Sequence, residues 1–208
     1  MTQDASPELA HLIDGYRSFR QTGWARRRER WEQLSQAQEP RVMVIACSDS
    51  RVDPAQIFDV DPGEIFVVRN VAALVPPFET SPGHHGVSAA LEFAVQVLKV
   101  KEVVVMGHGM CGGCKAALTQ SLHGAPRGEG GFIADWIAML DEAREPVAAQ
   151  HGTTGRDAER AMEQAGVKVI GYGSHIEGED GWNVFDNYQG AELVAAETQP
   201  IDIVVSDV

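Results

Sequence analysis

Residues 103–114 read VVVMGHGMCGGC and join a short apolar run to a loop rich in glycine, sulfur and imidazole. The run Val103 to Met106 contains no polar residue, which is typical of a strand buried on both faces of a parallel sheet. A loop that only turned the chain could use Gly and Asn, but this one carries His108, Cys111 and Cys114. The stretch therefore predicts a buried strand that ends in soft metal ligands or redox thiols.

Two further apolar runs of this kind lie upstream, at residues 42–46 and 65–68. Between the runs at residues 65–68 and 103–106, Ser81-Pro82 is expected to open a helix with apolar residues at helical spacing. Further helices are expected from about Gly112 and over residues 132–149. Buried strands that alternate with helices predict an α/β fold with a central, mostly parallel sheet flanked by helices.

Residues 1–36 predict an N-terminal helical arm that precedes the sheet. Ser6 followed by Pro7 is typical of an N-cap with proline at the first helical position. Apolar residues then recur at helical spacing, Gly23 is expected to interrupt the helix, and an arginine-rich helix follows over residues 24–34.

The composition restricts the classes of function. A formal net charge of −13 argues against nucleic acid or an anionic membrane surface as a partner, because both require basic patches. No run approaches the ~20 apolar residues of a membrane span, and the start of the sequence lacks the pattern of a signal peptide. The chain has three Cys, an odd and small number that argues against a fold held together by disulfides. We therefore expect a single soluble cytoplasmic domain over residues 1–208.

A second polar cluster, Cys47-Ser48-Asp49-Ser50-Arg51, directly follows the apolar run at residues 42–46. The carboxyl ends of parallel strands meet at one edge of a sheet, where ligands bind beside a reversal of strand order. If the two strands are neighbours, Cys47, His108 and Cys111 can converge on one ion. Two thiolates and an imidazole suit Zn²⁺ and leave a fourth position open, as in catalytic zinc sites.

Asp49 and Arg51 lie on the same turn as Cys47 and could complete such a site. Two thiolates cancel the charge of Zn²⁺, so a bound water is acidified less than at a site of His ligands alone. The Arg51 guanidinium and the start of the helix near Gly112 could help to stabilise hydroxide. Asp49 could pair with Arg51 and accept a hydrogen bond from the hydroxide, or could move onto zinc as a fourth ligand.

The motif CSDSR after one strand and the motif GHxxCGG after another resemble the β-class carbonic anhydrases. Arg69-Asn70-Val71 and the segment at residues 89–95 extend the resemblance. It implies a zinc lyase that takes part in carbon utilization. Such an enzyme, a carbonate dehydratase, hydrates CO₂ reversibly to bicarbonate by attack of zinc-bound hydroxide. The resemblance also implies a homodimer or higher homo-oligomer. The zinc ligands that it implies are Cys47, His108 and Cys111. The catalytic pair that it implies is Asp49 and Arg51.

The resemblance ends at about Lys168. Residues 169–208 hold eight acidic residues and no Lys or Arg, and we interpret them as a divergent acidic C-terminal segment. Residues 167–172 could be the family's final strand, reached by a shortened route. The remainder could be a divergent end, an added edge strand at residues 201–205, or foreign sequence.

Two other functions fit the same residues. A hydrolase of carbonyl sulfide or carbon disulfide could use the same fold and zinc ligands, because a fold does not determine a substrate. Cys111 and Cys114 also match the C-x-x-C pattern of a thiol redox or zinc-storage protein. That interpretation leaves His108 and the CSDSR turn without a role, and Cys114 is most simply a buried thiol in the first turn of a helix.

Overall fold

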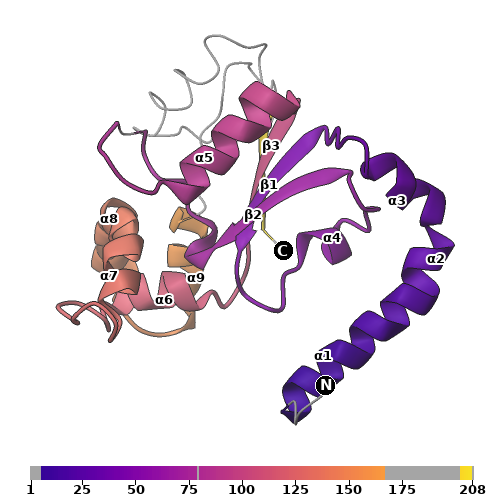
Figure 1. Cartoon of the computed structure of the whole chain (residues 1–208). Helices are drawn as coiled ribbons and strands as arrows, with labels where there is room; N and C mark the ends of the chain where they lie inside the picture. Colours follow the sequence, from indigo (N-terminus) through magenta and orange to yellow (C-terminus); the bar gives the residue numbers. More distant parts are fainter. Residues whose placement is uncertain (1–5, 79, 167–201, 208) are drawn as a thin grey trace. The chain divides into compact units, whose positions relative to one another are not determined.

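The computed structural model describes residues 6–78, 80–166 and 202–207 (Figure 1). The chain divides into two compact units, Met1–Gln38 and Glu39–Val208. The first unit contains the helical arm, and the second contains the sheet and the candidate site. The expected single domain over residues 1–208 stays a prediction. No helix in the described part of the chain is both long and apolar enough to cross a membrane.

The first unit is a run of helices in which the N-cap is confirmed and the predicted interruption is wrong. The Ser6 hydroxyl accepts a hydrogen bond from the Leu9 N–H at 3.3 Å. Gly23 has helical backbone angles, and a π-helical turn over Phe19–Gly23 carries the chain onward. A Cβ at Gly23 would lie 3.0 Å from the Phe19 ring, so glycine makes room for that ring. The break falls at Arg27, with φ −109° and ψ 29°. The helices are α1 (Pro7–Ser18), α2 (Trp24–Arg26) and α3 (Arg28–Leu34).

The second unit is built on a parallel four-stranded sheet of order β2-β1-β3-β4. Its strands are β1 (Val42–Cys47), β2 (Ile65–Asn70), β3 (Glu102–Gly107) and β4 (Asp202–Asp207). The three predicted buried runs all form strands, and β1 and β3 are neighbours, with Ala46 opposite Met106. The strand β4 lies at the edge of the sheet beside β3 and overlaps residues 201–205, where an edge strand was one of the interpretations of the C-terminal segment. Residues 167–172, expected as another strand, lie outside the described residues.

The sheet is most deeply buried at its centre. Met43, Ile45 and Ala46 of β1 are fully buried, as the apolar run predicts. The prediction of burial on both faces is wrong for β2, where Val67 is 38% exposed. The strand β2 lies at the edge of the described sheet, so only β1 covers it from the side. On one face, the Phe66 ring packs against Phe93 at 5.9 Å between centroids.

Helices connect the strands and cover the sheet (Figure 1). The helix expected near Gly112 is confirmed, but the helix expected from Ser81 begins only at Gly86. The segment from Ser81 instead forms a bend, in which the His85 ring Nε2 lies 2.9 Å from the Ser81 carbonyl oxygen. The helices are α4 (Pro54–Ile57), α5 (Gly86–Glu92), α6 (Gly112–Thr119), α7 (Gly131–Ile137), α8 (Asp141–His151) and α9 (Arg156–Gly166).

The helix predicted over residues 132–149 is divided into α7 and α8 by a 3₁₀ turn at Ala138–Leu140. Ile137 and Leu140 are both buried in the core, and the tighter 3₁₀ turn aligns side chains three positions apart. The helix α9 was not predicted. It packs against α6 and α8, so the helices within residues 112–166 form a layer beside the sheet.

The order of the strands determines where a site can form. The chain moves from β1 outward to β2 and then returns past β1 to β3. The carboxyl edge between β1 and β3 is therefore the topological switch point of the sheet, the usual location of ligand sites in this architecture. Cys47 ends β1 and His108 directly follows β3 at that edge.

Candidate metal centre

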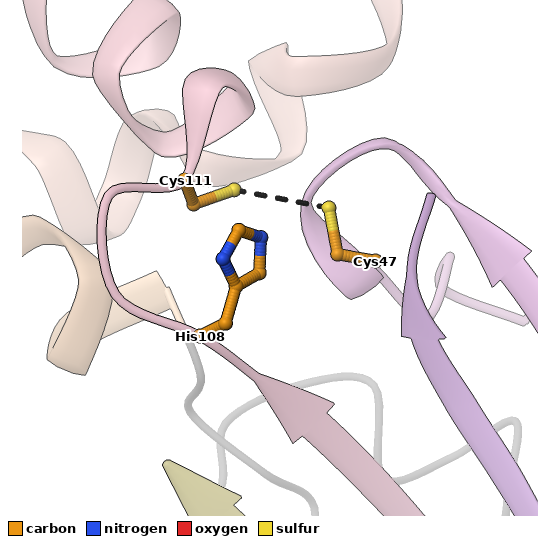
Figure 2. Close-up of side chains that lie close together, drawn as sticks. All are labelled: Cys47, His108 and Cys111. Atoms are coloured by element: carbon orange, nitrogen blue, oxygen red, sulfur yellow. Dashed lines mark hydrogen bonds between the residues drawn. The ribbon is translucent and has the colours of Figure 1, made fainter. Parts of the chain in front are cut away.

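Cys47, His108 and Cys111 form a cluster of buried side chains at the switch point. One ligand atom from each lies within 4.8 Å of the others, and the two Sγ atoms are 4.0 Å apart. Figure 2 shows the three side chains directed toward one another from the end of β1, the loop after β3 and the start of α6. Their exposed fractions are 5%, 3% and 3%. The structure thus brings together the three residues that the sequence singled out as metal ligands.

The imidazole of His108 is oriented for binding through Nε2. Its Nδ1 lies 2.9 Å from the Gly109 carbonyl oxygen, which can only accept, so Nδ1 carries the proton. That tautomer leaves a lone pair on Nε2, which is buried and has no hydrogen-bond partner in the described part of the chain. Buried polar atoms almost always have partners, and an orphaned nitrogen beside two thiols fits a metal ligand.

Both thiols of the cluster hold their protons more strongly than an ordinary cysteine. The hydrogen bond with Cys111, together with burial, raises the pKa of Cys47 to about 12. The hydrogen bond with Cys114 and burial also raise the pKa of Cys111. Without a cation the buried pair therefore stays protonated at neutral pH, because two adjacent thiolates would repel each other in a dry site. A bound divalent cation would remove this penalty and convert both thiols to thiolates.

Asp49 and Arg51 form a two-point ion pair beside the cluster. Arg51 Nε donates to Asp49 Oδ1 at 2.8 Å and Nη2 donates to Oδ2 at 2.7 Å. The Arg51 backbone N–H adds a third hydrogen bond to Oδ1 at 3.0 Å. These contacts hold the pKa of Asp49 well below its usual range. Of the two arrangements that the sequence left open for Asp49, the structure has the one in which it pairs with Arg51.

Arg51 also connects the two loops that supply the cluster. Its Nη2 donates a hydrogen bond at 3.0 Å to the carbonyl oxygen of Met110, between His108 and Cys111. Met110 has φ 60°, in the left-handed region that few non-glycine residues adopt. The guanidinium therefore fixes both the Asp49 carboxylate and a backbone carbonyl of the loop after β3.

Arg69, at the end of β2, holds the CSDSR turn from the other side. Its Nε donates to the Cys47 carbonyl oxygen at 2.8 Å and its Nη2 donates to the Asp49 carbonyl oxygen at 2.6 Å. Its Nη1 lies 3.4 Å from Asp53 Oδ2. The sequence motifs predict no role for Arg69 in the site. Its position at the end of an apolar run was the feature of the sequence that could have indicated such a role. In the sheet, Arg69 is paired with Ala46, next to Cys47.

The first turn of α6 is pressed closely against the turn after β2. A Cβ at Gly113 would lie 2.9 Å from both Ala72 Cβ and Val71 Cγ1. Asn70 braces that turn, because its Oδ1 accepts the Leu74 N–H at 2.7 Å and its Nδ2 donates to the Leu74 carbonyl oxygen at 2.8 Å. Glycine thus permits an approach of backbone to backbone that places the start of α6 beside the sheet.

The family model for carbonic anhydrase matches residues 42–171, which include both loops of the cluster. The chain belongs to the β-class carbonic anhydrase family. A carbonic anhydrase of Synechococcus elongatus is 44% identical over 141 residues, which are 67% of this chain and 49% of that relative. The chain spans only 38% and 49% of the length of the first curated carbonic anhydrases that it matches.

Solved β-carbonic anhydrases have the same fold. The Coccomyxa β-carbonic anhydrase in complex with acetazolamide superposes with a TM-score of 0.74 at 29% identity, covering 97% of this chain and 83% of that one. A tetrameric β-carbonic anhydrase from Sordaria macrospora gives a TM-score of 0.65 at 27% identity and covers 78% of each chain. The resemblance seen in the two motifs is therefore confirmed, and the family model extends it over residues 42–171.

Proposed function

We propose that this carbonic anhydrase homologue catalyses the reversible hydration of CO₂ to bicarbonate, as a carbonate dehydratase, with zinc held by Cys47, His108 and Cys111. The observation that carries the proposal is the orphaned, buried Nε2 of His108 beside two buried thiols. One nitrogen and two sulfur donors fit Zn²⁺ and leave a fourth position for a small molecule. A zinc ion bound there would supply the Lewis acidity that lowers the pKa of a water and polarises the substrate.

Asp49 is proposed to orient the attacking water. The contacts from Arg51 hold the pKa of its carboxyl well below the usual range, so Asp49 is ionised across the pH range of the reaction. An ionised carboxylate can only accept hydrogen bonds. Asp49 would therefore accept the hydrogen bond of the water and direct its lone pair toward the carbon of CO₂.

Arg51 is proposed to have two roles. Its bonds to both Asp49 oxygens keep the carboxylate in one orientation. Its positive charge, with the backbone N–H groups at the start of α6, favours the negative charge that develops as bicarbonate forms. Its bond to the Met110 carbonyl oxygen keeps that charge close to the loop that supplies His108 and Cys111.

The alternatives have less support. The family model and the solved structures are carbonic anhydrases, which favours CO₂ over carbonyl sulfide or carbon disulfide as the substrate. Among the described residues, the cluster with metal-ligand geometry contains Cys47 and His108 and does not include Cys114. The ligand set therefore differs from the C-x-x-C pair of a thiol redox protein.

We also propose a homodimer or higher homo-oligomer in the cytoplasm. Large apolar side chains are exposed in both units, and the Sordaria macrospora relative is described as tetrameric. A cytoplasmic location suits a site that needs reduced thiols, and all three cysteines of this chain are free. The most exposed of these apolar residues are Leu12, Tyr16, Val97 and Phe132.

Zinc content and CO₂ hydration, measured on one preparation, test the function. The purified protein should hold one zinc ion per chain and hydrate CO₂ in a stopped-flow assay. Cys111→Ser should lose tight zinc binding and activity, whereas Cys114→Ser should keep both, because Cys114 is the matched buried thiol outside the cluster. Equal zinc loss in both variants would contradict the ligand assignment. Hydrolysis of carbonyl sulfide without CO₂ hydration would contradict the substrate.

A further inference from the structure

Glu163 is a buried carboxylate close to the metal centre that the proposed mechanism does not use. It lies on α9 and is 6% exposed. Among the residues with described side chains, it and His108 are the buried polar or charged ones. Burying a carboxylate is costly unless hydrogen bonds compensate for the lost water. The contacts of Glu163 therefore indicate what it does in the fold.

The Glu163 carboxylate binds the backbone of a metal-ligand residue. Its Oε1 accepts a hydrogen bond at 3.2 Å from the N–H of Cys111, across 52 positions of sequence. Cys111 is the N-cap of α6, and its own side chain makes no capping hydrogen bond. The second oxygen, Oε2, lies 4.0 Å from the place that a Cβ of Gly109 would occupy. The carboxylate thus lies against the loop between His108 and Cys111.

The helix α9 lies beside α6 and α8 in the helical layer after β3 (Figure 1). It packs against α6, and its residues Ala158 and Met162 are buried in the core. One turn before Glu163, Glu159 forms an ion pair with Lys115 of α6, with 2.8 Å between Glu159 Oε1 and Lys115 Nζ. Two acidic residues on successive turns of α9 therefore contact two points on α6 and its cap.

We propose that Glu163 is a positioning residue of the metal centre. By accepting the Cys111 N–H, it fixes the backbone from which His108 and Cys111 reach the metal. The inference rests on the proposed zinc site. Residues that orient metal ligands through hydrogen bonds typically change metal affinity by about 10–100-fold when they are replaced.

Three substitutions separate this role from general packing. Glu163→Met keeps the length of the side chain but removes the acceptor, and Glu163→Gln keeps an acceptor oxygen. Glu159→Gln is the matched control, because it weakens the docking of α9 without touching the Cys111 backbone. Zinc affinity is measured by competition with a chelator, and the geometry of the site by the visible spectrum of the Co²⁺-loaded protein. Hydrogen exchange of residues 108–112 is measured on the metal-free protein.

Glu163→Met should bind zinc about 10–100-fold more weakly, alter the cobalt spectrum and speed exchange at residues 108–112. Glu163→Gln and Glu159→Gln should stay within about threefold of the parent affinity and keep its spectrum, since both retain an acceptor for the Cys111 N–H. If Glu163→Met does not fold, Glu163→Asp takes its place with the same expectation, because its shorter side chain withdraws the acceptor.

Three results would overturn the inference: parent-like zinc affinity in Glu163→Met, a loss in Glu163→Gln as large as in Glu163→Met, or an equal loss in Glu159→Gln. A parent protein that binds no zinc would contradict the proposed function instead. In that case hydrogen exchange still decides the positioning role, because it requires no metal. Parent-like exchange in Glu163→Met would then overturn it.

Discussion

Two adjacent glycines at the start of α6 should respond differently to replacement by alanine, with a loss of stability at Gly113 and none at Gly112. In Gly113→Ala, the new Cβ would lie 2.9 Å from Ala72 Cβ and Val71 Cγ1, and 3.3 Å from the Ala72 nitrogen. Ordinary contacts are about 3.4–4 Å, so α6 or the turn must move by roughly half an ångström or more. Ala72 cannot yield by changing a rotamer, because its contacting atoms belong to or adjoin the backbone. We expect the overpacking to cost about 1–3 kcal/mol.

Gly112 is the matched control, because a Cβ there meets nothing within 4 Å. Gly112→Ala should be neutral or should stabilise the fold by up to about 1 kcal/mol, since alanine restricts the unfolded chain. At about 2–4 °C per kcal/mol, Gly113→Ala should melt about 2–12 °C below the parent and Gly112→Ala at or slightly above it. Thermal unfolding of the metal-free proteins, followed by circular dichroism, measures both shifts without a contribution from zinc.

A Gly113→Ala variant that melts at or above the parent temperature would show that the contact with Ala72 and Val71 imposes no strain. Equal losses of stability in the two variants would show instead a general effect of alanine at the start of the helix. A loss confined to Gly113→Ala shows that the close approach of α6 to the turn after β2 is a real constraint on the site.

Three further predictions concern the chemistry of the site. Arg51→Ala should keep its zinc but lose roughly 10²–10³ of the CO₂ hydration rate, and a parent-like rate would show that Arg51 has no catalytic role. Asp49→Asn should lower the rate without moving the midpoint of its rise with pH, because the lowered pKa of Asp49 leaves it ionised throughout that range. A shifted midpoint would assign the titration to Asp49. Because the pKa values of Cys47 and Cys111 are raised, zinc must displace two thiol protons, so apparent affinity should rise about 100-fold per pH unit near neutral pH. Chelator competition from pH 6 to 8 checks this slope, and a flat profile would mean that the thiols are not the ligands.

The cluster of Cys47, His108 and Cys111 could be predicted from the sequence because its residues lie at or just after the ends of two strands. Cys47 ends one apolar run and His108 follows another, and parallel pairing aligns the two strand ends. The spacing from His108 to Cys111 is local and does not depend on the rest of the fold. Two short motifs and the rule for parallel sheets were therefore sufficient to locate the three residues.

The residues that hold the cluster in place could not be predicted in this way. Glu163 lies 52 positions from the backbone that it binds, and nothing in the pattern of α9 indicates which of its acidic residues points inward. The three contacts of Arg69 depend on the register of β2 against β1. The role of Gly23 also differs from the prediction of a break, because this glycine makes room for the Phe19 ring within a helical run.

The span between the two thiols also bears on how the chain reaches its folded state. Cys47 and Cys111 are 64 positions apart. A metal ion shared by them would act as a cross-link, and closing a loop of that length removes about 4 kcal/mol of chain entropy from the unfolded ensemble in the simple entropic description. Such a cross-link would restrict the chain in which the metal is bound and would favour the pairing of β1 with β3, because Cys47 and Cys111 follow these two strands. Bound metal would therefore oppose the separation of the two central strands when the chain unfolds.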